Sequence, residues 1–251
     1  MKPLALAFAA ATFMAAPALA SDLTDLSEDD RSAFREEVRA YLLEHPEVLM
    51  EAIAVLERRQ AAEAVALDAA MIAANAEELF DDGYSHVTGN PDGDITMVEF
   101  VDYRCGYCRK AFPELMELIK EDGNIRLIYK EFPVLGEGST MTSKFAISTQ
   151  LIAGQEGYAQ VHDALMSMRA KPSEAVLVVM ADDLGLDGQA IWDGMDDPRI
   201  AEIIQNNHLL GQRMEISGTP AFVVEDQMLR GYVPLEGMMQ IVDELRAAKE
   251  R

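Results

Sequence analysis

Residues 95–108 read ITMVEFVDYRCGYC, and this stretch decides the fold. Its first half, Ile95–Val101, is rich in β-branched and aromatic residues, which predicts a strand. From Cys105 to about Lys120 apolar residues recur at helical spacing, at Phe112, Leu115, Met116 and Ile119. The cysteine pair is therefore expected where a strand ends and a helix begins.

That position favours an ionised thiol at Cys105. Backbone N–H groups at a helix N-terminus are unpaired, and the positive end of the helix dipole stabilises a thiolate. Arg104, Arg109 and Lys110 add positive charge around the pair, with only Asp102 opposing them nearby. This local excess of cations is expected to lower the thiol pKa further.

The spacing of the pair suits redox catalysis. The intervening dipeptide, Gly106-Tyr107, leaves the cysteines close enough to form a disulfide and to release a mixed disulfide quickly. We predict Cys105 as the exposed nucleophile and Cys108 as the resolving thiol. An inert disulfide is a poor alternative because so small a loop adds little stability. A zinc or copper site would need further ligands, and no histidine lies near the pair in the sequence.

Strands and helices alternate around this stretch. The other expected elements are a short strand at 85–88, a strand at 125–129, helices through 139–214 with breaks near 154, 172, 185–188 and 198, a hairpin of 221–224 and 228–231, and a helix at 235–249. The order is β-α-β, a helical insertion at about 139–215, then β-β-α. It predicts an α/β protein with a thioredoxin fold and an inserted helical domain.

Two further features can serve the cysteines. Glu99 lies in the predicted strand, six residues before Cys105, where a buried carboxylate can take or relay the proton of Cys108; the alternative is an exposed strand residue. The dipeptide Thr219-Pro220 precedes a strand, where a cis peptide would expose a backbone edge to an extended substrate. An ordinary trans proline loop is the alternative there.

The N-terminal 80 residues have a different character. Residues 1–20 carry one charge, a long apolar run and a small-x-small ending, which predicts a cleaved signal peptide rather than a membrane anchor. Residues 21–80 are expected to form a helical extension, with a helix start at Ser27 and a break at Pro46. Its narrow apolar stripe favours self-association over packing on its own domain. Residues 81–251 would then form the thioredoxin domain.

Composition limits the possible functions. The chain has 251 residues and a formal net charge of −23, which argues against nucleic acid or an anionic membrane as its partner. Two cysteines cannot build a disulfide scaffold or a four-cysteine zinc site. The four histidines, His45, His86, His162 and His208, are scattered and are expected at the surface or at helix caps. No metal ligands and no cofactor are predicted.

Three segments carry a family resemblance: 99–108 (EFVDYRCGYC), 130–136 (KEFPVLG) and 218–222 (GTPAF). Together they resemble the DsbA family of thioredoxin-fold disulfide oxidoreductases. The Cys-Gly-Tyr-Cys pair with a helical N-terminal extension is similar to its ScsC (suppressor of copper sensitivity C) and Com1-like subgroup. Between the two cysteines of this chain, Gly106-Tyr107 occupies the position where the strongly oxidising members of the DsbA family have Pro-His.

The resemblance implies roles for single residues. Cys105 would be the nucleophile, Cys108 the resolving thiol, Glu99 the buried acid and Thr219-Pro220 the cis-proline loop. It also implies that the N-terminal helices oligomerise the protein.

We therefore predict a periplasmic thiol–disulfide oxidoreductase that acts on the thiols and disulfides of proteins. Whether it works as isomerase, reductase or oxidase stays open, and a membrane redox partner and a homo-oligomer are expected. One alternative is a copper- or zinc-handling envelope protein that uses the same cysteines. Another is a glutathione-linked enzyme of the same fold, although a serine usually replaces the first cysteine there.

Overall fold

The computed structural model describes residues 27–250, so the signal peptide predicted for residues 1–20 lies outside the described residues. The chain divides into two compact units between Arg59 and Gln60. Within the described part, none of the helices is long and apolar enough to cross a membrane.

The first unit contains helix α1 (Glu28–Glu44) and the start of α2 (Glu47–Ala74). Ser27 caps α1 by accepting the N–H of Asp30 at 3.2 Å, as the predicted helix start requires. Pro46 separates the two helices, which confirms the predicted break. Every residue of α1 is at least partly exposed, although its sequence is amphipathic.

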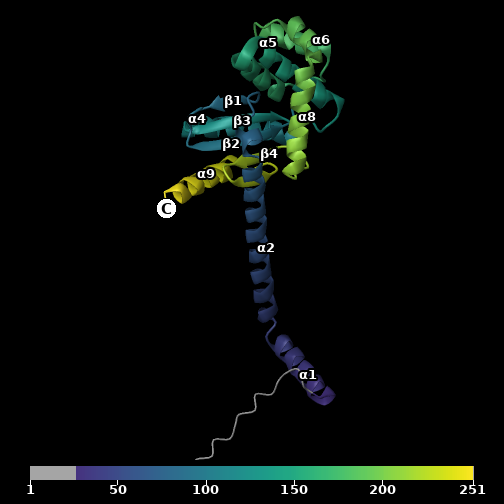
Figure 1. The fold of residues 1–251 in the computed structure, drawn as a ribbon, viewed down its shortest axis with the longest axis vertical. Helices are drawn as coiled ribbons and strands as arrows, with labels where there is room; N and C mark the ends of the chain where they lie inside the picture. Colours follow the sequence, from purple (N-terminus) through teal and green to yellow (C-terminus); the bar gives the residue numbers. More distant parts are fainter. Residues whose placement is uncertain (1–26, 251) are drawn as a thin grey trace, which may run out of the picture. The chain divides into compact units, whose positions relative to one another are not determined.

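The second unit is built on a five-stranded sheet in the order β1-β3-β2-β4-β5 (Figure 1). Its strands are β1 (His86–Gly89), β2 (Ile95–Val101), β3 (Ile125–Glu131), β4 (Ala221–Val224) and β5 (Gln227–Arg230). The two central strands, β2 and β3, are parallel, and the other pairs are antiparallel. The thioredoxin-like order of elements predicted from the sequence is confirmed.

Helices cover both faces of this sheet. They are α3 (Ala76–Phe80), α4 (Gly106–Asp122), α5 (Glu137–Ser167), α6 (Glu174–Asp183), α7 (Gly188–Asp193), α8 (Pro198–Arg213) and α9 (Leu235–Lys249). Because side chains alternate along a strand, β2 sends Met97 to a core formed with α4, α5 and α9. It sends Val98 and Phe100 to a second core formed with α2, α3 and α8. Helices α5 to α8 form the predicted insertion, and α5 is broken at Gly154, where φ is 74°.

The boundary between extension and domain differs from the predicted one near residue 80. Ile72 of α2 and Leu79 of α3 are buried in the second core, so residues 60–80 belong to the second unit. The buried amine of Lys130 strengthens this attachment by pairing with Asp82 and donating to the carbonyl of Glu78. The second unit therefore begins before residue 81, where the sequence analysis starts the thioredoxin domain.

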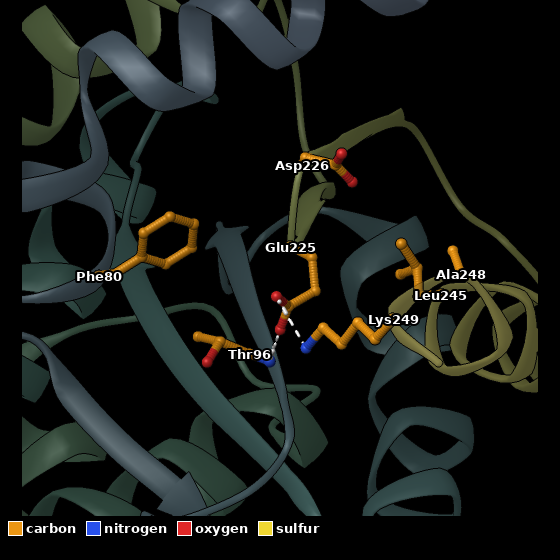
Figure 2. A pocket seen from close by; sticks show the side chains of 7 residues that line it. All are labelled: Phe80, Thr96, Glu225, Asp226, Leu245, Ala248 and Lys249. Atoms are coloured by element: carbon orange, nitrogen blue, oxygen red, sulfur yellow. Dashed lines mark hydrogen bonds and ion pairs between the residues drawn. The ribbon is translucent and has the colours of Figure 1, made fainter. Parts of the chain in front are cut away.

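One pocket of the second unit lies at the opposite end of β2 from the cysteines. Figure 2 shows its lining residues: Phe80, Thr96, Glu225, Asp226, Leu245, Ala248 and Lys249. Glu225 accepts the N–H of Thr96 at 2.6 Å and pairs with Lys249 at 3.1 Å. Thr96 is near the start of β2, whereas Cys105 follows its end, so this pocket is no part of the cysteine site.

Candidate active site

Strand β2 and helix α4 position the two cysteines. Cys105 is the N-cap residue of α4 and Cys108 lies in its first turn, as the sequence predicts. Cys108 is 0% exposed and Cys105 is 7% exposed, so Cys105 is less open than predicted. Both are free thiols. The Sγ of Cys105 donates to the carbonyl oxygen of Thr219 at 3.1 Å.

The thiol of Cys105 is strongly acidic. The Cys108 thiol donates a hydrogen bond to it, and this contact is the largest cause of a pKa of about 5 for Cys105. Burial opposes the shift, while the side chain of Thr219 and the N–H groups of Cys108 and Tyr107 add to it. These N–H groups belong to the first turn of α4, which confirms the expected effect of the helix N-terminus.

The nearby cations have a smaller effect than predicted. Arg109 donates through Nε to the carbonyl of Tyr103 at 2.7 Å, and Lys110 lies over the ring of Tyr232. The leading causes of the low Cys105 pKa are hydrogen bonds rather than these charges. The cationic cluster therefore does not dominate the electrostatics of the thiol.

Glu99 is a buried acid beside the pair. It is 0% exposed in the middle of β2, between β3 and β4, which excludes the exposed-strand alternative. Neither carboxyl oxygen has a hydrogen-bond partner among residues 27–250. Burial, followed by the negative charges of Cys105 and Glu131, raises the pKa of Glu99 to about 8. The pKa of Cys108 is raised as well, first by its hydrogen bond to Cys105, then by burial and by the charge of Glu99.

A cis-proline loop faces the nucleophile. The Thr219-Pro220 peptide is cis, as predicted, and β4 begins at the next residue. The carbonyl of Thr219 contacts Cys105, and that of Pro220 accepts the N–H of Gly231 at 3.0 Å. Residues 114 positions apart in the sequence thus meet at the thiol.

Asp102 is a residue whose role the sequence did not reveal. It is fully buried, and its Oδ1 accepts the N–H of Arg104 at 2.7 Å. Its Oδ2 accepts the N–H groups of Val134 and Leu135 at 2.8 and 3.1 Å. Asp102 therefore fastens the loop after β3 to the cysteine loop. The sequence did offer one sign of this role, since Asp102 is an acidic residue between a buried strand and the cysteine pair.

A second buried network joins the cysteine loop to the insertion. Glu131, at the end of β3, accepts the hydroxyls of Tyr103 and Tyr158, each at 2.6 Å. Tyr103 also hydrogen bonds to Nδ1 of His162 at 2.9 Å. Burial raises the pKa of Glu131 to about 7 and lowers that of His162 to about 3. His162 and His86 are buried, so the prediction that they lie at the surface or at caps is wrong.

Other titratable groups offer little for a metal ion. Among residues 27–250, no group of three or more His, Cys, Asp and Glu side chains is arranged to hold one.

Comparison with known proteins agrees with this geometry. A model of the DSBA-like thioredoxin domain matches residues 96–243, and one of the copper resistance protein ScsC N-terminal domain matches residues 30–63. A thioredoxin-like oxidoreductase from Silicibacter pomeroyi DSS-3 is 38% identical, with a TM-score of 0.63 over 68% of this chain and 97% of that one.

Two further solved structures extend the likeness. The thiol-disulfide exchange protein alpha-DsbA2 from Wolbachia pipientis is 27% identical, with a TM-score of 0.68 over 73% of this chain and 98% of that one. A linker-deletion mutant of Proteus mirabilis ScsC is 26% identical, with a TM-score of 0.66 over 90% of this chain and 100% of that one.

The first curated relatives are much longer proteins. Na(+)/H(+) antiporter NhaA 3 of Salinispora tropica is 26% identical over 162 residues, which are 64% of this chain and 25% of that protein. The chain thus spans about a quarter of that relative's length. Since the DSBA-like match itself covers more than half of the chain, the protein belongs to the DSBA-like thioredoxin domain family, and its N-terminal segment matches the ScsC N-terminal domain.

Proposed function

We propose that this protein is an exported enzyme that exchanges disulfides with protein substrates through Cys105 and Cys108. The observation that carries the proposal is the acidic, slightly exposed Sγ of Cys105, held 3.1 Å from the carbonyl of Thr219 before a cis proline. Such a thiol is ionised at neutral pH and is the attacking group that exchange requires.

The first step forms a mixed disulfide. The Cys105 thiolate attacks one sulfur of a client disulfide, the client S–S bond breaks, and the other client sulfur leaves as a thiolate. An extended client segment pairs with the backbone edge at Thr219-Pro220, which keeps its sulfur next to Cys105. In the oxidising direction the same bonds form and break in reverse.

The second step resolves the mixed disulfide. Cys108 attacks the Sγ of Cys105, which releases a reduced client and leaves a Cys105–Cys108 disulfide; alternatively, a second client thiolate releases Cys105 and the client is isomerised. Glu99 takes the proton of Cys108. Once Cys105 is in a mixed disulfide its negative charge is gone, so one cause of the high pKa of both Glu99 and Cys108 disappears. A lower pKa leaves more of the Glu99 carboxyl ionised and able to accept a proton, and Cys108 loses the hydrogen bond to a thiolate that is the largest cause of its high pKa.

The first unit supports self-association. Its apolar groove is lined by Phe34, Val38, Leu42, Leu43 and Leu49, together with Arg35 and Arg39. Exposed apolar side chains along α1 and α2 favour burial against further copies of the chain. Several linked domains would hold one client while its cysteines rearrange, which favours isomerisation over a single exchange.

Localisation and redox partner complete the proposal. The sequence of residues 1–20 favours export to the periplasm, where a membrane protein would reset the redox state of the cysteine pair.

Trapping tests the function. Without its resolving thiol, Cys108→Ala should accumulate mixed disulfides between Cys105 and client proteins on non-reducing gels. The double variant lacking Cys105 as well is the matched control and should trap none. If Cys108→Ala traps no protein in the cell envelope, proteins are the wrong substrate class.

A further inference from the structure

Two tyrosines lie beside the dithiol and have no part in the exchange itself. Tyr107 stands between the cysteines and is 63% exposed. Its ring is stacked with that of Tyr232, with centroids 6.4 Å apart and planes 29° apart. Tyr232 follows β5, so the two rings come from distant parts of the chain.

The ring of Tyr232 is fixed in place. Its hydroxyl donates to Oε1 and Oε2 of Glu114 at 2.7 and 2.9 Å, and Glu114 also accepts the N–H of Leu235 at 2.8 Å. The amine of Lys110 lies 4.1 Å from the centroid of the ring. A ring held by these contacts loses little freedom when a ligand packs on it.

The rings lie next to the substrate edge proposed above. Gly231, which precedes Tyr232, donates to the carbonyl of Pro220, while the carbonyl of Thr219 contacts Cys105. A client that pairs with this edge and presents a cysteine to Cys105 therefore brings neighbouring side chains toward the rings.

We propose that Tyr107 and Tyr232 form an aromatic ledge that selects clients with an aromatic side chain next to the reacting cysteine. The inference rests on the proposed function. Lys110 and Glu114 flank the ledge with opposite charges. The hydrogen bond from Tyr232 lowers the pKa of Glu114 most, followed by that from the N–H of Leu235, and the charge of Lys110 adds to it. Their charges offset each other, so the ledge favours an aromatic partner over a charged one. Stacking on such rings increases binding by about three- to tenfold.

Reaction rates of three disulfide peptides test this selection. The peptides differ only in the residue next to the cysteine, which is Phe, Ser or Asp. The reduced protein should react with the Phe peptide about three- to tenfold faster than with the Ser peptide. In Tyr232→Ala and in Tyr107→Ala this ratio should fall to about one.

Matched variants distinguish an effect of the two rings from general damage to the protein. Tyr232→Phe keeps the ring and should keep most of the Phe-to-Ser ratio, and Val179→Ala, an exposed apolar position of α6, should leave the ratio as in the wild type. Equal rates with Phe and Ser, or a preference for Asp, overturn the ledge while disulfide exchange stands. Failure of the wild type to react with any of the peptides overturns the ledge and the proposed function together.

Discussion

The thiolate of Cys105 should make the stability of the reduced protein depend on pH. Its pKa is about 5 in the folded protein, whereas an unperturbed thiol titrates at 9.0. Because the folded pKa lies below the unfolded one, the stabilisation is present at neutral pH and is lost as the pH falls through about 5. Substituting Cys105→Ser replaces the thiol by a smaller hydroxyl and removes the titration.

The size of the effect follows from the pKa values. At pH 7 the folded thiol is two pH units above its pKa of about 5, and the unfolded thiol is still protonated. At ~1.36 kcal/mol per unit, the thiolate contributes about 3 kcal/mol to the free energy of unfolding at pH 7. At pH 4 both states are protonated and the contribution is about zero. Solvent screening at the partly exposed Sγ makes this figure an upper value.

Urea unfolding of the reduced wild type and of Cys105→Ser at pH 4 and pH 7 measures this contribution. The difference between the two proteins should grow by about 3 kcal/mol from pH 4 to pH 7, since the titrating groups that do not interact with Cys105 cancel. The ultraviolet absorbance of the thiolate should titrate over the same range and be absent from the variant. A difference that changes by less than about 0.5 kcal/mol would refute the reasoning, because ordinary surface substitutions reach that size.

The other predictions concern groups next to the thiol, the second core and the N-terminal helices. Cys108→Ala removes the donor that contributes most to the low Cys105 pKa, so thiolate absorbance should titrate at higher pH in this variant than in Cys108→Ser, which keeps a donor; equal titrations contradict the assignment. Glu99→Gln should slow resolution of the mixed disulfide by about 10²-fold or more, measured on quenched-flow gels. An unchanged rate would show that Glu99 takes no part in the proton transfer. Burial raises the pKa of Glu99 to about 8 in the folded protein, so the free energy of unfolding of the wild type should fall by about 3 kcal/mol as the pH rises from 4.5 to 7. Glu99→Gln should not show this fall. Leu79→Ala should cost about 2–5 kcal/mol in thermal or urea unfolding. A truncated protein of residues 60–251 should stay folded and be a monomer in light scattering, whereas the mature chain should form an oligomer. If both proteins are monomers, the self-association proposal is wrong.

The sequence predicted the elements of the fold well because their signals are local. Periodicity and turn residues defined β2, α4 and α9, and Pro46 separated two helices as expected. The spacing of Cys105 and Cys108 after a buried strand was enough to predict a thiolate at a helix N-terminus, and the structure gives its pKa the expected direction.

Residues whose role depends on distant partners were not predicted from the sequence. Asp102 looked like a countercharge to nearby cations, yet its carboxylate is fully occupied by backbone N–H groups of two loops. His162 looked like a surface residue because a polar residue within a helix carries no local sign of burial. Tyr103 and Tyr129, which contact its ring, lie outside its helix.

What the sequence by itself determined is the chemistry of the cysteine pair and the order of strands and helices around it, since both depend on neighbours within one or two turns of chain. Only the tertiary structure decided what surrounds the thiol. The contact of Thr219 with Cys105, the burial of Glu99 without a partner, and the attachment of Ile72 to the second unit all join segments far apart in the chain. Such contacts depend on sheet register and packing, and burial in turn determines the pKa of each acid.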